Sequence, residues 1–195
     1  MDYKIALLTD FSNEEKRSAF NCLSTAQKAY IDAKPKNKAE QSLCARILLA
    51  KLLCNGQEEF HKILSNFSFK SDKRPFLIGR EGQFISISHS ENAVAVAYSD
   101  FPVGIDIQKN KEINPKLINR VLTNQEKQYV LNNGKDNFFK LWTAKEAIIK
   151  TGECSFLKAI ATSFVRENKI LTPDNFHLIQ ENFMDYTLSV IEKIK

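Results

Sequence analysis

Residues 103–108 read VGIDIQ, and this short stretch decides how the rest of the chain is interpreted. Its apolar residues alternate with others, which is typical of a strand. Ile105 and Ile107 share one face of this predicted strand, and Asp106 and Gln108 share the other. A carboxylate on a mostly apolar strand is costly to bury without a partner. We therefore expect Asp106 either to pair locally or to bind a cation.

The chain before this stretch changes from a helical to a strand-like pattern. Apolar spacing and helix-start residues predict helices at about 14–23, 24–35, 37–54 and 57–64. Alternation and turn residues predict strands at 3–11, 67–69, 76–78, 84–88 and 93–98.

The same order of elements returns after residue 110. Helices are predicted at 115–122, 123–131 and 136–151, and strands at 160–165, 176–182 and 186–191. This order indicates an α+β protein of two similar halves, a pseudo-dimer, in which each half packs a helix or helices on a small, mostly antiparallel sheet. We place the N-terminal half at 1–102 and the C-terminal half, which carries most of the candidate metal and catalytic residues, at 103–195. An active cleft is expected between them.

Composition excludes several classes of protein. Hydrophobic residues make up 43% and charged residues 26% of the 195 residues, with 6 glycines and 5 prolines, which excludes a collagen-like or mainly disordered chain. The 28 basic and 23 acidic residues give a net charge of +5, too modest for a dedicated nucleic-acid binder. This charge still suits a phosphate-bearing or acidic partner.

The sequence also indicates where the protein works. No apolar stretch is long enough for a membrane span, and the first residues lack the features of a signal peptide. The four cysteines show no CxxC spacing of the kind that tetrahedral zinc sites use. We therefore expect a cytoplasmic protein with reduced thiols and no membrane partner.

A second candidate segment is ISISHS at 85–90. A strand end exposes its last side chains at a sheet edge, where Ser88 and His89 could donate hydrogen bonds to a phosphate. The alternative is an ordinary turn histidine between two serines. A lysine-rich segment at 28–38 leaves a similar choice between a solvated helix end and a place where a phosphate binds.

A third candidate segment is FFKLWTAKEAIIK at 138–150. On a helix, Trp142, Glu146 and Lys150 are spaced four residues apart and form one stripe. The simplest interpretation is a core tryptophan beside an exposed ion pair. The functional interpretation is a second metal-binding carboxylate beside a phosphate-binding ammonium, with Glu126 on the preceding helix as a third acid.

Together and in this order, these segments resemble the 4′-phosphopantetheinyl transferase superfamily, and the length suits its surfactin-synthetase-activating (Sfp) type. The most specific element is W-x-x-K-E-A-x-x-K-x-G at 142–152, which follows Ser88-His89-Ser90, Gly104-Ile105-Asp106-Ile107 and Glu126. The resemblance covers about residues 73–152 motif by motif and extends more faintly to 24–53.

The resemblance implies an enzyme that transfers the 4′-phosphopantetheine group of coenzyme A to a serine hydroxyl of an apo acyl or peptidyl carrier protein. The second product is adenosine 3′,5′-bisphosphate, and the reaction depends on Mg²⁺. By similarity, Asp106, Gln108 and Glu146 bind the metal, although many relatives have a glutamate in place of Gln108. Mn²⁺ accepts the same oxygen ligands.

The resemblance also assigns roles in catalysis and in binding coenzyme A. Asp106, Glu146 and Lys150 are the implied catalytic residues, and the base is Glu146, Glu126 or a water molecule. The implied contacts to coenzyme A are Lys28, Lys73, Arg74, Ser88, His89 and Lys150. An arginine expected near Gln41 is missing, and Lys38 is its candidate replacement.

Two alternatives follow from the same residues. One is a Mg²⁺-dependent hydrolase of nucleotide pyrophosphates, and the other is a non-catalytic phosphate- or RNA-binding module that uses residues 28–38. For the transferase we expect a monomer whose carrier protein, typically acidic, docks near 113–122, where Lys111, Lys116 and Arg120 flank apolar positions.

Overall fold

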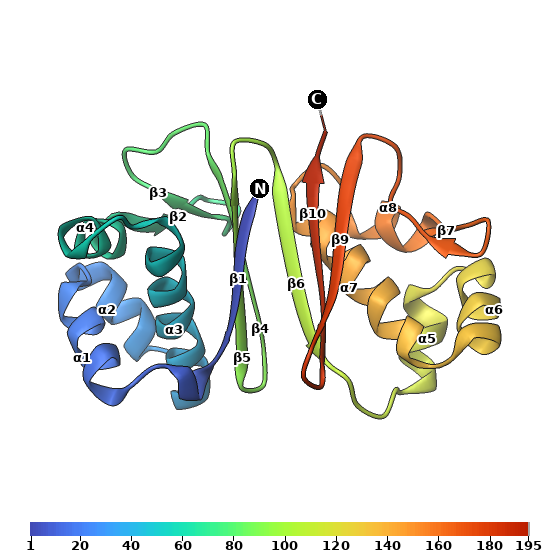
Figure 1. Cartoon of the computed structure of the whole chain (residues 1–195), viewed down its shortest axis with the longest axis horizontal. Coiled ribbons are helices and arrows are strands. Elements are labelled where there is room, and N and C mark those ends of the chain that lie inside the picture. The colour runs from blue at the N-terminus through green and yellow to red at the C-terminus, as the bar shows by residue number, and fades with distance from the viewer. Residues whose placement is uncertain (195) are drawn as a thin grey trace. The chain divides into compact units, whose positions relative to one another are not determined.

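The computed structural model describes residues 1–194. The chain divides into two compact units, unit 1 at Met1–Asp100 and unit 2 at Phe101–Lys195. Each unit combines helices with small antiparallel sheets (Figure 1), which confirms the predicted α+β class. The pseudo-dimeric relation between two similar halves stays a prediction.

Unit 1 contains a three-stranded sheet, a short hairpin and a group of helices. Its elements are β1 (Asp2–Leu7), η1 (Leu8–Asp10), α1 (Asn13–Cys22), α2 (Thr25–Asp32), α3 (Lys36–Leu53), α4 (Gln57–Asn66), β2 (Phe67–Phe69), β3 (Pro75–Leu77), β4 (Phe84–Ser90) and β5 (Ala93–Ser99).

The core of unit 1 lies between α3 and the sheet, whose strand order is β1-β5-β4. The central strand β5 reads AVAVAYS and is buried except at Tyr98, because it has neighbours on both edges and α3 packs against it. The long helix α3 is buried from Leu43 to Ala50. This apolar layer holds β4 and its last residues in place.

Within its described residues 101–194, unit 2 contains a second three-stranded sheet, a short two-stranded sheet and four helices. Its elements are β6 (Val103–Lys109), α5 (Pro115–Val121), α6 (Asn124–Asn133), α7 (Asp136–Lys150), α8 (Phe156–Ala161), β7 (Val165–Arg166), β8 (Lys169–Ile170), β9 (Phe176–Phe183) and β10 (Tyr186–Lys193).

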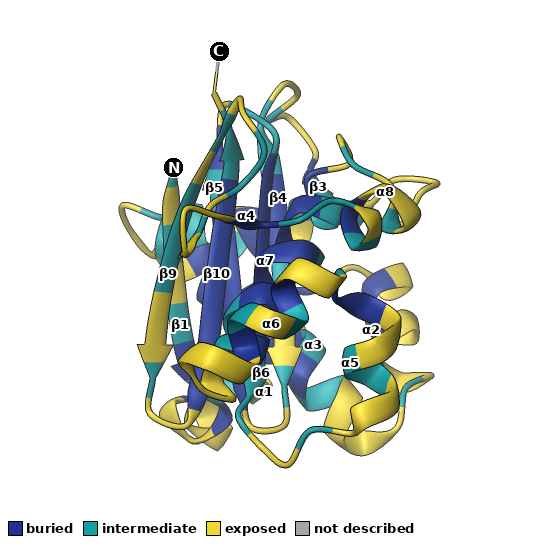
Figure 2. Cartoon of the chain, turned by 90° about the vertical axis from the view of Figure 1, so that its right-hand side faces the viewer, coloured by how far each residue is buried: buried dark blue, intermediate teal, exposed yellow. Residues whose placement is uncertain are grey.

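The sheet of unit 2 has the order β6-β10-β9, and all its pairings are antiparallel. Its central strand β10 is buried over most of its length, as its dark blue colour in Figure 2 shows. Helix α7 packs against both β6 and β10. Because Asp106 pairs with Ser189 of β10, the position of the carboxylate along the sheet is fixed.

One predicted element is wrong. The strand predicted at 160–165 is instead the end of helix α8, followed by the two-residue strand β7. Ser155 caps this helix, since its hydroxyl accepts a hydrogen bond from the Lys158 N–H at 3.3 Å. The strand predicted at 3–11 is shorter, because the chain turns into η1 after Leu7.

Within residues 1–194, no helix combines the length and the apolar character that crossing a membrane requires.

Candidate active site

The site in unit 2 begins with a close approach of two backbones. A Cβ atom built on Gly104 would lie 1.8 Å from the carbonyl oxygen of Ala147, which is much shorter than the distance that real Cβ atoms keep from other atoms. Gly104 is in β6 and Ala147 is in α7, so only a glycine lets the strand come this near to the helix. The approach brings the residues around Gly104 and Ala147 into one small region.

Asp106 and Lys150 form the centre of this region. The Lys150 ammonium donates hydrogen bonds to Oδ1 of Asp106 at 2.7 Å and to the carbonyl oxygen of Ile105 at 3.0 Å. Asp106 is 3% exposed, whereas Lys150 is half-buried. The local ion pair expected of a carboxylate on an apolar strand is therefore present.

Glu146 adds a second carboxylate. Burial raises the pKa of the Glu146 carboxyl, the negative charge of Asp106 raises it further, and the positive charge of Lys150 offsets part of the rise. A buried carboxyl that lies close to a second carboxylate is suited to share a cation with it or to take up a proton.

Gln108 completes the set of oxygen donors that the sequence predicts for a metal. It follows Asp106 on the same face of β6, pairs with Thr187 of β10 and is half-buried. Among residues 1–194 no group of three or more His, Cys, Asp or Glu could hold a metal ion. The donors offered are thus two carboxylates and one amide, all of them hard oxygen ligands of the kind that Mg²⁺ takes together with substrate phosphates and water.

Glu126 lies apart from the group around Asp106 in its contacts, which are structural. It is fully buried at the start of α6, where Thr123 and Glu126 form the predicted capping box. Its Oε2 accepts from the Thr123 N–H at 2.8 Å, and its Oε1 accepts from the Phe164 N–H at 2.9 Å. Its Oε2 also lies 3.0 Å from the Lys145 ammonium. These contacts use the carboxylate to hold the fold, which argues against Glu126 as the base.

Lys145 is the buried partner in this pair and has no exposed surface. Its ammonium donates to the carbonyl oxygens of Ala159 and Thr162, each at 2.9 Å. The pair therefore ties α6, α7 and the C-terminal end of α8 together. Sequence spacing did not reveal this role, although a lysine inside an apolar helical run is a signal for a buried, paired cation.

In unit 1, β4 ends with the predicted phosphate-binding segment. Ser88 is buried and pairs with Ala95, while His89 is exposed and pairs with Val94. The antiparallel ladder places these two side chains on opposite faces of the strand. The structure thus presents His89, rather than Ser88, to solvent within this unit.

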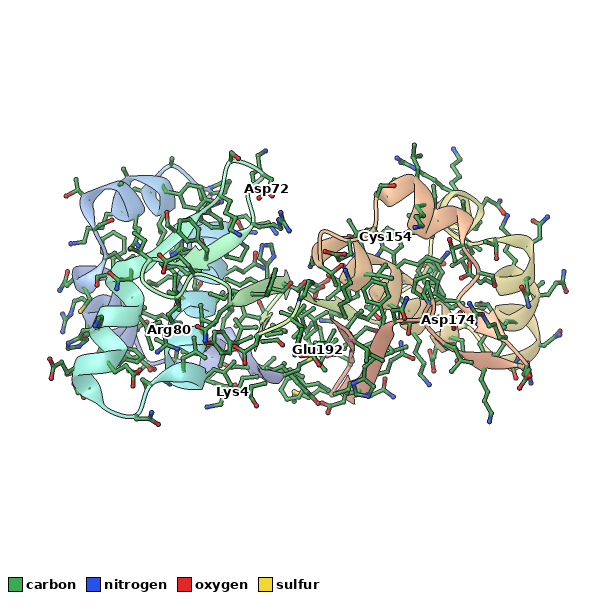
Figure 3. All side chains as sticks on the ribbon, turned by 90° about the horizontal axis from the view of Figure 1, so that it is seen from above. Lys4, Asp72, Arg80, Cys154, Asp174 and Glu192 are labelled. Atoms are coloured by element: carbon green, nitrogen blue, oxygen red, sulfur yellow. The ribbon has the colours of Figure 1, made fainter. Side chains whose placement is uncertain are left out.

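The three other cations predicted to bind coenzyme A also lie in unit 1. Lys28 donates to the carbonyl oxygen of Asn21 at 3.0 Å. Arg74 makes an ion pair with Asp72, with its Nε 2.7 Å from Oδ2, and Lys73 occupies the turn beside it with φ of 67°. Figure 3 shows Asp72 at the outer end of this loop between β2 and β3. Their role toward coenzyme A stays a prediction.

Unit 2 thus brings together the predicted catalytic group Asp106, Glu146 and Lys150, whereas Glu126 serves a different contact. The sequence alone does not show why residue 104 is a glycine, since the cost of a Cβ there depends on a helix that lies about 40 residues further along the chain.

Residues 102–190 match the family model of the 4′-phosphopantetheinyl transferase superfamily. The matched segment includes most of the chain of unit 2, helix α7 and the predicted catalytic group Asp106, Glu146 and Lys150.

Three curated relatives carry the name 4′-phosphopantetheinyl transferase. The transferase gsp of Aneurinibacillus migulanus is 31% identical over 157 residues, which cover 74% of this chain and 63% of that protein. The transferase Sfp of Bacillus subtilis (strain 168) is 29% identical over 119 residues, or 59% of this chain and 53% of that protein. The transferase psf-1 of Bacillus pumilus is 39% identical over 69 residues, or 33% of this chain and 30% of that protein.

The chain therefore spans less than two thirds of the length of these curated relatives. The matches confirm the resemblance that the motifs indicate, and they lie where the structure gathers Asp106, Glu146 and Lys150. Over residues 102–190, the chain is thus similar to the 4′-phosphopantetheinyl transferase superfamily.

Proposed function

We propose that this protein transfers the 4′-phosphopantetheine group of coenzyme A to a serine hydroxyl of an acyl or peptidyl carrier protein. The observation that carries the proposal is the group Asp106, Glu146 and Lys150, which lies inside the segment that matches the family. The names of the curated relatives support the same reaction.

In this reaction the serine oxygen forms a bond to the β-phosphorus of the coenzyme A pyrophosphate. The bond between that phosphorus and the bridging oxygen breaks, and adenosine 3′,5′-bisphosphate leaves. The serine hydroxyl gives up one proton. The enzyme must therefore hold the pyrophosphate, balance its charge and accept the proton.

The donor set fits a hard divalent cation. Asp106 and Glu146, with Gln108 as a neutral ligand, would hold Mg²⁺, and Mn²⁺ is the alternative. A cation bound there supplies positive charge to the pyrophosphate oxygens. The same cation would also lower the repulsion between the two carboxylates that raises the pKa of Glu146.

Glu146 is the base in this proposal. Its carboxylate lies beside the proposed cation site and forms no ion pair within residues 1–194, so it can accept the serine proton directly or through a water molecule. Asp106 is the less suitable base, because its Oδ1 is held by the Lys150 ammonium at 2.7 Å.

Lys150 serves both the protein and the substrate. Its ammonium carries three N–H groups, and two of them reach Asp106 and the carbonyl of Ile105. The third can donate to a phosphate oxygen. The remaining contacts to coenzyme A in the proposal are those of Lys28, Lys73, Arg74, Ser88 and His89.

A surface on α5 is proposed for the carrier protein. Lys116 and Arg120 are both exposed on this short helix. A hollow of about 660 Å³ beside it is lined by apolar side chains, among them Ile113, Ile118 and Phe139, and by two basic and two acidic residues at positions 111, 112, 135 and 136. Positive charge next to an apolar hollow suits an acidic helical partner with apolar contact residues.

The carrier surface can be tested by reversing its charge. In the variant Lys116→Glu/Arg120→Glu, the KM for the carrier should rise about tenfold while the KM for coenzyme A stays the same. The matched control is Lys169→Glu on β8, an exposed lysine of the same unit. An unchanged KM for the carrier in the double variant would reject the surface.

The transfer itself is tested by incubating the protein with coenzyme A, Mg²⁺ and an apo carrier, and then measuring the mass of the carrier. We expect a gain of one phosphopantetheine, and no gain when the serine of the carrier is replaced by alanine. Cleavage of coenzyme A without a mass gain on any of several carriers would favour a pyrophosphate hydrolase. An inert protein that binds RNA or phosphate would overturn the enzyme proposal.

A further inference from the structure

Gln41 makes one directed contact inside unit 1. This residue lies in the first half of α3 and is only 2% exposed. Its amide Nε2 donates a hydrogen bond to the carbonyl oxygen of Glu91 at 2.6 Å, fifty residues further along the chain. Glu91 lies in the turn that joins β4 to β5. The contact therefore connects the long helix of the unit to the tip of its sheet.

The β4–β5 turn has a backbone conformation that a contact from another element helps to hold. Glu91 has φ of 48°, a left-handed conformation that a residue with a side chain adopts only at a cost. The next residue, Asn92, has its carbonyl oxygen bonded to the Leu8 N–H at 2.7 Å. Consecutive carbonyl groups of the turn are thus held by α3 on one side and by η1 on the other.

Stability alone does not account for a glutamine at this position. The Oε1 atom of Gln41 is buried and has no hydrogen-bond partner among the described residues. A buried amide with one unpaired polar atom is less favourable than an apolar side chain of the same shape. What the amide provides, and an apolar side chain cannot, is the hydrogen bond to the turn.

This turn directly follows the segment Ser88-His89-Ser90, the proposed phosphate contact at the end of β4. His89 pairs with Val94 and Ser90 with Ala93, so a shift of the turn moves the last two pairs of the ladder. The side chain of His89 is exposed and extends from the backbone of these last ladder pairs. A turn that is held in place therefore also holds the backbone that carries His89.

We propose that Gln41 is a positioning residue, which holds the β4–β5 turn so that His89 meets the phosphates of coenzyme A. The proposal rests on the function proposed above. It also gives a reason for the missing arginine near this position: the residue here is buried and serves the turn, and it is not itself a phosphate contact.

The test uses two substitutions of similar size. Gln41→Met removes both polar atoms, and Gln41→Glu keeps the shape but replaces the N–H donor with an acceptor. Both variants should raise the dissociation constant and the KM for coenzyme A about tenfold and leave kcat within about twofold. The dissociation constant is measured by calorimetry without carrier, and hydrogen exchange at residues 89–93 should become faster.

The control is Ile47→Val, a buried core change six residues further along the same helix. Its melting temperature falls, but its affinity for coenzyme A should equal that of the wild type. If Gln41→Met lowers only the melting temperature and leaves this affinity unchanged, Gln41 is structural and the inference is overturned.

A double-variant cycle shows whether Gln41 acts through His89. In a His89→Ala background, the change Gln41→Met should weaken coenzyme A binding less than about twofold. The reason is that the His89 side chain, which Gln41 is proposed to position, has already been removed. Full additivity of the two changes would overturn the inference. If the wild type binds no coenzyme A at all, the proposed function fails; if it binds and the Gln41 variants bind equally well, only the inference fails.

Discussion

Each unit contains a long helix on a three-stranded sheet, and the two helix–strand contacts are built differently. In unit 1, α3 packs on β5, whose sequence AVAVAYS offers only small and β-branched side chains over its first five residues. In unit 2, α7 packs on β6, whose sequence VGIDIQK contains a glycine and a carboxylate. One contact is made by apolar side chains, and the other by backbone at Gly104 and by charge at Asp106.

The difference separates a contact that serves the fold from one that suits the proposed chemistry. An all-apolar layer stabilises without any need for precise charge placement. The layer of unit 2 contains the ion pair of Asp106 with Lys150 and a Glu146 carboxyl whose pKa is raised by burial and by Asp106. Such groups lower stability unless all are paired, so their presence marks the site.

The largest expected effect is on activity in unit 2. Asp106→Asn keeps the shape but removes the charge that Lys150 and a metal ion would share, so transfer to the carrier should fall about 10³-fold or more. The rate is measured from carrier mass at fixed times. The control Asp174→Asn removes an exposed carboxylate of the same unit that pairs with Arg166. Equal losses in both variants would show that the effect is not specific to the site.

The second effect compares buried cations in the two units. Lys145→Met leaves Glu126 buried and unpaired, so the free energy of unfolding should fall by about 3–5 kcal/mol. The double variant Glu126→Gln/Lys145→Met should recover much of this loss. Both values come from urea unfolding followed by circular dichroism.

Arg46 of unit 1 sharpens this comparison. It is 3% exposed, its guanidinium lies 4.3 Å from the centre of the Phe67 ring, and burial lowers its pKa to about 10. It has no carboxylate partner among residues 1–194. Arg46→Met should therefore cost less than Lys145→Met, because it leaves no opposite charge behind. A larger loss of unfolding free energy for Arg46→Met than for Lys145→Met would contradict this comparison of the two buried cations.

The third effect tests the close approach at Gly104. The change Gly104→Ala places a methyl group against the Ala147 carbonyl and should lower the free energy of unfolding by about 1–3 kcal/mol. It should also lower activity, because β6 must move away from α7. The control Gly56→Ala in unit 1 meets no atom within 4 Å and has extended backbone with φ of 168°. The stability of both variants is measured by thermal unfolding. A Gly104→Ala variant as stable as the wild type would contradict the close approach.

The smallest effect concerns Gln108. The change Gln108→Glu adds a third carboxylate on the same face of β6, so half-maximal activity should need about threefold to tenfold less Mg²⁺. The measurement is activity against Mg²⁺ concentration at saturating coenzyme A. An unchanged Mg²⁺ requirement would show that Gln108 does not face the metal.

Much of this fold was predictable, because periodicity and capping residues are local signals. The strands 84–88 and 103–107 and the helix 136–151 appear within a few residues of their expected bounds. Helix α8 was missed, because its six residues span fewer than two turns and are too few to show the helical spacing of apolar residues. The spacing of Trp142, Glu146 and Lys150 predicted one stripe on α7.

Contacts between distant segments were not predictable in the same way. The 1.8 Å approach at Gly104, the pair of Glu126 with Lys145 and the hydrogen bond from Gln41 to the turn all join residues from different elements. Sequence spacing fixes which side chains share a face, but it does not fix which neighbour covers that face.

The most direct test of the account is the binding of a divalent cation at Asp106 and Glu146. Mn²⁺ is titrated into the protein with coenzyme A present, and the free ion is followed by its electron paramagnetic resonance signal. We predict that the wild type binds one Mn²⁺ and that Asp106→Asn and Glu146→Gln each weaken this binding about 30-fold or more. Binding of Mn²⁺ with equal affinity in the wild type and both variants would contradict the account.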